Sequence, residues 1–352
     1  MGACLPGNAG LRLCRRSFIS HLCSLILHKG CTYDDEKNGR CGARCQEKDE
    51  KSGTGVAEKA AYALFSMLLS IFGTYSYAQT GKVIPRRELF SGTASFHFID
   101  VGQGDATLVL TGDAAVLIDA GTGDFAGALV AYLKTYVGRL DYLILTHPYD
   151  DHVGGADEVL ESIPVGRVLM PLVEHDGYTE SLMKQAAELG IPVFDAKLGG
   201  QYAAGDITCT LLGPVRKDYE NLNDVSAVVR VDVGGVSMLV SGDAELEGET
   251  DVLRANDPAL LDCDIYQVGH HGSSTSTSLE FYTAISPDHC VISCGYGNSY
   301  GHPHTTVLQL LTLSGAEVYR TDTEGTIVLD TDGKTITRRG KMSWETESEP
   351  AA

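Results

Sequence analysis

Apolar and polar positions alternate regularly from residue 94 to residue 338, and this pattern predicts short strands, tight turns and several helices. The segment ASFHFIDVG alternates residue by residue, as a half-buried strand does. Gly112-Asp113 and Gly234-Gly235 separate pairs of apolar runs, which is typical of hairpin turns. The last segment, 317–339, is predicted to form one closing hairpin. Helices are predicted at about 125–137, 156–163, 178–190, 245–254, 278–285 and 305–315.

The strands and helices fall into two roughly equal halves, and acidic residues or histidines follow strands in both. Asp119 and His147 follow strands in the first half, and Asp243 and His270 follow strands in the second. This distribution predicts an α/β (α+β) domain over residues 94–338. Two packed sheets with helices outside would carry a site at one rim.

Residues 60–78, AAYALFSMLLSIFGTYSYA, carry no charge, follow Lys59 and end in a small-x-small pattern. This is typical of the hydrophobic region and cleavage site of an export signal, or of an uncleaved membrane anchor. The several Ser, Tyr and Thr residues favour a signal peptide; a buried core helix is the alternative. We therefore expect a secreted or cell-surface protein whose mature chain starts near Gln79. Only this segment would contact a membrane.

The two ends of the chain differ from its regular part. Residues 1–59 show little periodicity. They are expected to be unstructured, or to extend from a start site assigned too early, with Met67 or a neighbour as the true start. The polar tail, 339–352, is expected to be disordered.

Charge and cysteine content narrow the function further. A formal net charge of −20 provides no basic surface for a polyanion, so a nucleic-acid substrate would depend on bound cations and a local patch. Six of the ten cysteines lie in the first 45 residues. Their spacing lacks the second pair that a zinc finger needs. Cys290 and Cys294 share one face of a predicted strand and are expected in the core.

The segment DYLILTHPYDDHVGG, residues 141–155, joins a buried strand to a polar turn. His147, Asp150, Asp151 and His152 lie within six positions, where the strand gives way to a helix. Imidazole suits borderline metals, carboxylate suits harder ones, and a turn between rigid elements fixes their geometry. Two later strands end in similar clusters, SGD and GHHGS. The pattern predicts a zinc or manganese site instead of an exposed polar loop.

The motifs HPYDDH-V-GG, SGD and GHHGS, each after an apolar strand, together resemble the metallo-β-lactamase fold superfamily. FIDVGQGDATLV, LIDAG, HHGS and GHPH resemble more narrowly the hydrolase domain of the ComEC competence proteins and its free-standing secreted relatives. The resemblance covers about residues 94–338. It implies a four-layer αββα sandwich that binds one or two metal ions. It also implies phosphodiester hydrolysis, such as DNA degradation by ComEC-like domains or phosphorylcholine ester cleavage by a surface esterase.

The resemblance assigns ligands to the first motif. His147 matches the first histidine of the superfamily's HxHxDH motif, and Asp151 and His152 match its closing pair. Tyr149 stands where the second histidine is expected. Since a phenol is a poor ligand for a divalent ion at neutral pH, we expect its hydroxyl to point at the substrate or at a metal-bound water.

The later motifs complete the implied ligand set. Asp243 matches the carboxylate that bridges two metals, and either His270 or His271 matches the final histidine. The histidine of the third motif is absent, because no histidine lies between 176 and 269. One metal position would then use Asp151, His152, Asp243 and one of His270 and His271, and the other would use His147, Asp243 and at most Tyr149.

Other polar residues receive supporting roles. Asp151 is a candidate base, and His271 or His302 could neutralise the developing charge or protonate the leaving group. Asp119 is expected to orient the HPYDDH loop, and Asp105 to line the pocket or cap its own turn. Further pocket positions are Asn223, Ser226 and His304.

The predicted function is metal-dependent hydrolysis by a metal-activated water, with Zn²⁺ or Mn²⁺ tightly bound at one position and more weakly at a second. The predicted substrate is DNA or a small phosphoester, and no stable protein partner is expected. An esterase or lactonase of the same superfamily is one alternative, disfavoured by the two missing histidines. A binding protein with a degraded site is another, suggested by Tyr149 but disfavoured by the retained Asp151, His152 and Asp243.

Overall fold

The computed structural model describes residues 93–173 and 177–340 of the chain. The predicted export segment at 60–78, the extension at 1–59 and positions 341–352 of the predicted tail lie outside the described residues. Within the described ranges, no helix has both the length and the hydropathy needed to cross a membrane.

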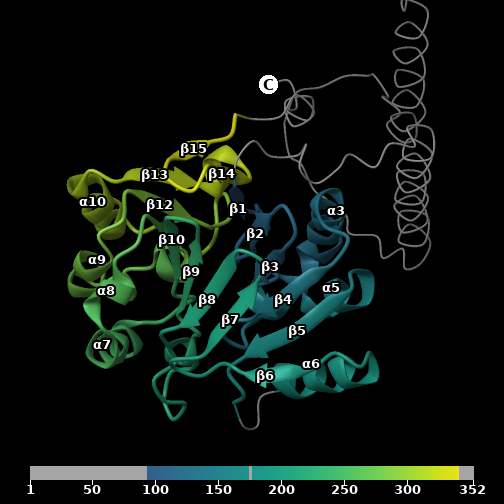
Figure 1. Ribbon diagram of the computed structural model, residues 1–352. Coiled ribbons are helices and arrows are strands. Elements are labelled where there is room, and N and C mark those ends of the chain that lie inside the picture. Colours follow the sequence, from purple (N-terminus) through teal and green to yellow (C-terminus); the bar gives the residue numbers. More distant parts are fainter. Residues whose placement is uncertain (1–92, 174–176, 341–352) are drawn as a thin grey trace, which may run out of the picture. The chain divides into compact units, whose positions relative to one another are not determined.

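Two β-sheets pack against each other at the centre of the domain (Figure 1). The first has the strand order β15-β14-β1-β2-β3-β4-β5-β6, and the second has the order β13-β12-β11-β10-β9-β8-β7. The first sheet contains β1 (Ala94–Phe98), β2 (Thr107–Thr111), β3 (Ala115–Ile118), β4 (Leu140–Ile144), β5 (Val165–Met170), β6 (Val193–Asp195), β14 (Ile327–Thr331) and β15 (Ile336–Arg338). The second contains β7 (Gln201–Ala204), β8 (Ile207–Leu211), β9 (Val229–Val233), β10 (Val236–Val240), β11 (Ile265–Gln267), β12 (His289–Ile292) and β13 (Glu317–Arg320).

Each sheet contains a block of parallel strands. Strands β3 to β6 are parallel in the first sheet, and strands β10 to β13 are parallel in the second. Parallel neighbours end at the same edge of a sheet, and ligand sites form outside those carboxyl ends. The topology therefore provides two rows of strand ends on which a site can be built.

Helices cover the outer faces of the two sheets. In Figure 1, α3, α5 and α6 lie on the side of the first sheet, and α7, α8, α9 and α10 lie on the side of the second. Their bounds are α3 (Ala126–Tyr136), α4 (Asp150–Val153), α5 (Ala156–Ser162), α6 (Gly177–Glu188), α7 (Leu246–Ala255), α8 (Pro258–Leu261), α9 (Leu279–Ile285), α10 (Thr305–Ser314) and α11 (Thr321–Glu324). Short 3₁₀ turns are η2 (Gly123–Phe125), η3 (Leu222–Val225) and η4 (Gly269–Gly272).

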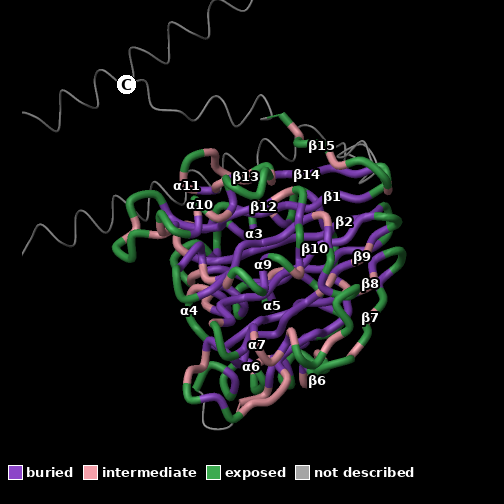
Figure 2. Tube along the Cα trace, turned by 90° about the vertical axis from the view of Figure 1, so that its left-hand side faces the viewer, coloured by how far each residue is buried: buried purple, intermediate pink, exposed green. Residues whose placement is uncertain are grey.

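Alternation along the strands divides the buried core, seen in Figure 2, into three apolar layers. Leu108 and Leu110 of β2 pack with the helices outside the first sheet, whereas Val109 between them packs between the two sheets. This follows because successive side chains of a strand point to opposite faces. Leu239 of β10 packs with the helices outside the second sheet. Three apolar layers separate four layers of structure, which confirms the predicted αββα sandwich.

The closing segment differs from the single hairpin predicted over 317–339. Strand β13 pairs in parallel with β12 in the second sheet, whereas β14 pairs with β1 and β15 in the first. The Thr321 hydroxyl fixes the crossing, because it accepts from the Cys294 amide at 2.9 Å and donates to the Cys294 carbonyl at 3.0 Å. The prediction failed because alternation marks strands but does not say which sheet each one joins.

Arg339 was predicted to belong to the tail but is bound to the domain. Its amide donates to the Val328 carbonyl at 2.9 Å, and its Nε donates to Asp330 Oδ2 at 2.8 Å. The ordered domain therefore continues at least through this residue.

The burial pattern generates a stability test with a matched control. Leu329 is fully buried between the sheets, whereas Leu313 on α10 is 86% exposed. Leu329→Ala should lower the free energy of unfolding by about 2–5 kcal/mol, because it removes buried methyl groups and leaves a cavity. Leu313→Ala should change that free energy by less than about 0.5 kcal/mol. Equal effects of the two substitutions in urea unfolding would contradict the assigned core.

Candidate metal centre

The predicted site residues come together at the carboxyl ends of strands from both sheets. In the first sheet, Asp119 directly follows β3, and His147 follows β4. In the second sheet, Asp243 follows β10, and His270 and His271 form the η4 turn after β11. Two separate parallel blocks therefore supply the two sides of one site.

Four side chains form a compact cluster there. One nitrogen or carboxylate oxygen from each of Asp151, His152, Asp243 and His271 lies within 4.8 Å of the others. Among them, His152 Nε2 and Asp243 Oδ1 are buried and lie 3.1 Å from each other, but neither atom has a hydrogen bond of good geometry, and buried His147 Nε2 nearby also lacks one. Buried polar atoms almost always have partners. A divalent cation fits this set, since imidazole nitrogens and carboxylate oxygens are its usual ligands.

Asp119 orients His152 within the cluster. His152 Nδ1 lies 2.8 Å from Asp119 Oδ2, and the Thr146 amide and hydroxyl donate to the same carboxylate at 2.7 and 2.8 Å. With Nδ1 engaged, Nε2 is the nitrogen that faces Asp243 Oδ1, at 3.1 Å. A carboxylate partner of this kind fixes the tautomer and raises the basicity of a metal-binding histidine. Asp119 thus occupies the loop-orienting position expected for it.

The structure distinguishes the two adjacent histidines, which the sequence could not. His271 is buried, and its Nδ1 lies 3.0 Å from the Ser293 carbonyl and 3.3 Å from Asp105 Oδ1. Its Nε2 lies 3.2 Å from Asp151 Oδ2 and 3.8 Å from Asp243 Oδ1. His271 is therefore the member of the pair that belongs to the four-residue cluster, and Asp105 supports it as Asp119 supports His152.

His270 points to the other side of Asp243. Its Nε2 lies 3.5 Å from Asp243 Oδ2, and its Nδ1 lies 3.2 Å from Thr275 Oγ1 and 3.4 Å from Glu245 Oε1. His270 and His271 have φ values of +51° and +55°. Such backbone costs about 1–3 kcal/mol per residue and persists only where the surroundings enforce it. The left-handed turn lets two consecutive imidazoles reach the two oxygens of one carboxylate.

Asp243 is thereby placed between two pairs of imidazoles. Its Oδ1 faces His152 and His271, and its Oδ2 faces His270 at 3.5 Å and His147 at 3.8 Å. Asp243 therefore has a pair of imidazoles on each of its two oxygens. His270 joins His147 on the Oδ2 side, whereas the sequence-based set there was His147, Asp243 and at most Tyr149.

Tyr149 lies beside His147, at the wall of the pocket. Its ring is 5.2 Å from the His147 ring in an edge-to-face arrangement, and the residue is 40% exposed. It lines the pocket that contains Asp243. Its exposure and place on the pocket wall are compatible with the prediction that its hydroxyl faces substrate.

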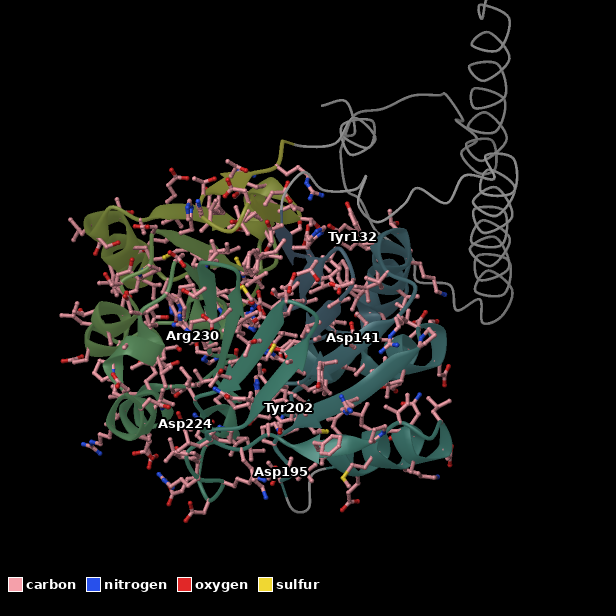
Figure 3. The ribbon with its side chains drawn as sticks, in the orientation of Figure 1. Tyr132, Asp141, Asp195, Tyr202, Asp224 and Arg230 are labelled. Atoms are coloured by element: carbon pink, nitrogen blue, oxygen red, sulfur yellow. The ribbon has the colours of Figure 1, made fainter. Side chains whose placement is uncertain are left out.

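The turn that carries Asp243 is fixed by η3. Ser226 Oγ accepts from the Asp243 amide at 3.1 Å. Gly242 has φ +52°, and a Cβ there would lie 2.8 Å from Thr146 Oγ1 and 2.9 Å from Ser226 Oγ. Asp224, labelled in Figure 3, accepts from the Glu245 and Gly248 amides at 2.9 Å and so fixes the start of α7. Ser226 and Asp224 therefore hold the turn that carries Asp243.

The pKa values of the cluster indicate an excess of negative charge. Burial alone would lower the pKa of His152 and of His271, but Asp243 with Asp119 or Asp105 raises both well above the usual value. Burial together with the neighbouring His152 lowers the pKa of His147 to about 3. Carboxylates that hold protons on buried imidazoles form a site that a metal cation can occupy by displacing those protons.

Asp151 has the same electrostatic character. Burial would raise its pKa, but the hydrogen bond with His271 and the nearby His152 outweigh burial and lower the pKa to about 2. The carboxylate is thus ionised throughout the neutral range. Its side chain is 30% exposed and faces the pocket.

A pocket of about 330 Å³ opens over the cluster. His302 and Asn223 line it as predicted; His304 does not, because its Nδ1 accepts from the Ser274 amide at 2.9 Å. Gln103 and Tyr300 also line the pocket, although neither was among the predicted site residues. Gln103 sits in the GQGD turn and Tyr300 precedes GHPH, so both motifs contained the signal. The residues lining the pocket are Gln103, Tyr149, Asp150, Asp151, Asn223, Asp243, His270, His271, Tyr300 and His302.

His302 has a distinct environment. Burial and the neighbouring His271 and His270 lower its pKa to about 4. Its ring stacks on Tyr300 at 5.6 Å, and its Nδ1 lies 3.5 Å from Gln103 Nε2. A neutral imidazole at pH 7 can form hydrogen bonds but carries no charge. His302 lines the pocket, and its predicted role in neutralising the developing charge or protonating the leaving group stays a prediction.

Known proteins share this sequence pattern. Residues 99–296 match the family model described as the metallo-beta-lactamase superfamily. ComE operon protein 3 of Bacillus subtilis (strain 168) is 34% identical over 257 residues, which cover 67% of this chain and 33% of that protein. Competence protein ComA of Neisseria gonorrhoeae is 32% identical over 263 residues, which cover 74% of this chain and 34% of that protein. The chain thus spans about a third of the length of these curated relatives.

A solved structure shows a similar match at lower identity. The metallo-beta-lactamase fold protein YhfI from Bacillus subtilis has 16% identity and a TM-score of 0.46, and the match covers 67% of this chain and 98% of that chain. The family match extends from the residue after β1 to the loop after β12 and includes each motif that supplies the cluster. This chain belongs to the metallo-beta-lactamase superfamily of metal-dependent hydrolases, as a ComEC-like member.

Proposed function

We propose that the chain is a phosphodiesterase that acts on DNA or on a small phosphoester. The observation that carries this proposal is the placement of Asp243 between two pairs of imidazoles. One pair, with Asp151, would hold the first ion, and the other pair would hold a second ion more weakly. Zn²⁺ and Mn²⁺ both accept such mixed nitrogen and oxygen ligands.

The chemistry follows from that placement. A divalent ion supplies a water of lowered pKa, near ~7, and polarises a phosphoryl oxygen. The Asp151 carboxylate would serve mainly as a ligand, because a group whose pKa is lowered to about 2 is a weak base, and its other oxygen can accept a hydrogen bond from an attacking water. His302 can donate a hydrogen bond toward a leaving oxygen, since its ring lines the pocket and is neutral at pH 7.

The charge of the pocket wall limits which substrates can bind. No lysine or arginine is among the described residues that line it, and Asp150 and Asp151 contribute carboxylates. The negative charge of a phosphodiester must therefore be offset by bound cations, as the net charge of −20 already suggested. The competence-related names of two relatives support DNA as the substrate. A small phosphoester would avoid the repulsion that a long polyanion meets here.

We also propose that the protein acts outside the cytoplasm. The support is the uncharged segment 60–78, which ends in a small-x-small pattern. The two proposals are independent, because the hydrolase domain begins after that segment.

The activity can be tested with bis-p-nitrophenyl phosphate and added Mn²⁺ or Zn²⁺. The wild type should hydrolyse it, and Asp243→Ala should lose most of its bound metal and at least about 100-fold in rate, because metal polarisation supplies several kcal/mol. The control is Asp206→Ala, at an exposed position in the turn between β7 and β8, which should retain both. Full metal and full activity in Asp243→Ala would disprove the ligand assignment. Bound metal without phosphodiester hydrolysis would instead favour an esterase, a lactonase or a binding protein.

Substitutions of Tyr149 distinguish a tyrosine that contacts substrate from one that binds metal. Tyr149→Phe should lower the rate by about 5- to 10-fold, the effect of one lost hydrogen bond, and leave the metal content unchanged. Tyr149→His should raise the content toward two ions, since an imidazole beside His147 adds a ligand. Metal stoichiometry on the three proteins decides. Two tightly held ions in the wild type, with one lost in Tyr149→Phe, would make the tyrosine a ligand.

The location is tested by expressing the full chain in a bacterial host and sequencing the N-terminus of the exported protein. The expected mature chain starts near Gln79, just after the small-x-small pattern. Recovery of the intact chain from the cytoplasm alone would refute the export proposal and leave the hydrolase proposal standing.

A further inference from the structure

A buried carboxylate outside the metal cluster is joined to a segment that follows the two histidines. Glu249 on α7 is fully buried, and its Oε1 accepts from the Thr277 amide at 2.5 Å. Its Oε2 accepts from the Ser278 amide at 2.9 Å, and the Ser276 hydroxyl lies 3.3 Å from Oε1. These donors belong to residues 276–278, five positions after His271. We call residues 273–278 the strap.

The strap reaches both ligand-bearing turns. Ser276 Oγ donates to the Ala244 carbonyl at 2.5 Å, next to Asp243. Thr275 Oγ1 lies 3.2 Å from His270 Nδ1. The strap therefore touches the residue after the bridging carboxylate and the ring of one histidine.

A tyrosine hydroxyl connects the strap to the two turns from inside. Tyr266 of β11 is fully buried, and its hydroxyl lies 3.1 Å from Thr277 Oγ1 and 3.3 Å from Ser241 Oγ. The Gly269 amide donates to the same hydroxyl at 3.1 Å. Ser241 lies two residues before Asp243, and Gly269 directly precedes His270. One hydroxyl thus bridges both ligand turns and the strap.

The contacts are close enough to define the backbone. A Cβ at Gly269 would lie 2.6 Å from Ser276 Oγ and 2.8 Å from Ser241 Oγ, so only glycine fits between the two hydroxyls. Thr277 has φ +57°, and the bonds of its amide to Glu249 and of its hydroxyl to Tyr266 hold it in that conformation. The histidine turn and the strap therefore both contain residues with positive φ, and their mutual contacts maintain these conformations.

We propose that Glu249 and the Tyr266 hydroxyl are positioning residues of the metal centre, which hold the His270–His271 turn at its distance from Asp243. Neither touches a ligand ring, so they act through the strap and the turn. The inference rests on the ligand assignment made for the proposed function. It does not depend on which ester is hydrolysed.

The free energy needed to bury the Glu249 carboxylate supports this assignment. Burial raises its pKa to about 7, and among the described residues its hydrogen-bond donors are the two strap amides, with the Ser276 hydroxyl 3.3 Å away and no lysine or arginine. Maintaining a buried carboxylate without a cation is costly, and a fold needs no such group merely to fill space. Two backbone amides aimed at it explain why an acceptor is kept at this position.

The test uses the full-length protein at pH 8, where Glu249 is ionised. Glu249→Gln turns an amide donor toward the amides of the strap, and Tyr266→Phe removes only the bridging hydroxyl. In each variant the dissociation constant for Zn²⁺, measured by chelator competition, should rise about 10- to 100-fold. The visible absorption of the Co²⁺-loaded protein should also change in shape, because it reports the ligand geometry. Glu280→Gln, at an exposed position on α9, is the matched control and should change neither.

Separate measurements keep the inference distinct from stability and from the proposed activity. The melting temperature of the metal-free variants in chelator reports any purely structural effect. Unchanged Zn²⁺ affinity and an unchanged Co²⁺ spectrum in Tyr266→Phe would overturn the proposal, whatever the melting temperature. If Glu249→Gln does not fold, Tyr266→Phe decides alone. Failure of phosphodiester hydrolysis in the wild type would leave these metal readouts intact, and would count only against the proposed function.

Discussion

The structure depends on one buried carboxylate that faces imidazoles contributed by both sheets. Asp243 is 2% exposed and would be costly to ionise there without compensating charge. The charges of His152 and His271 outweigh burial and lower its pKa well below the usual value. His152 lies on α4, which follows the first sheet's β4, and His271 follows the second sheet's β11. The packing of one sheet on the other therefore sets the distance between ligands.

This dependence explains why polar groups are buried so densely around a small pocket. Each imidazole near Asp243 needs its other nitrogen engaged, and Asp119 and Asp105 serve two of them. Both carboxylates are themselves buried. The Thr146 amide and hydroxyl donate to Asp119, whereas Asp105 Oδ1 lies 3.3 Å from His271 Nδ1 and has no hydrogen bond of good geometry. A partly satisfied polar network is less favourable than an apolar core, so the site is maintained at a cost in stability.

The sequence predicted those features that depend on local pattern and on motifs. Alternation placed most strands, and the motifs identified His152, Asp151 and Asp243 as ligands. It could not choose between His270 and His271, because consecutive positive φ values reverse the usual rule for where neighbouring side chains point. It missed Glu249, whose partners lie 27 to 29 residues away in sequence. It also assigned β13 and β14 to one hairpin, because strand pairing across two sheets is a tertiary property.

The charge of the centre connects metal occupancy with substrate binding. Four carboxyl groups, those of Asp105, Asp119, Asp151 and Asp243, lie in or directly behind the cluster. With neutral histidines, one divalent ion would offset only half of their charge, and a phosphodiester adds a further negative charge. No lysine or arginine in the described pocket lining supplies the difference. The proposed second ion between His147 and His270 would balance the four carboxylates, so on that proposal its occupancy would determine whether a phosphate is repelled or admitted.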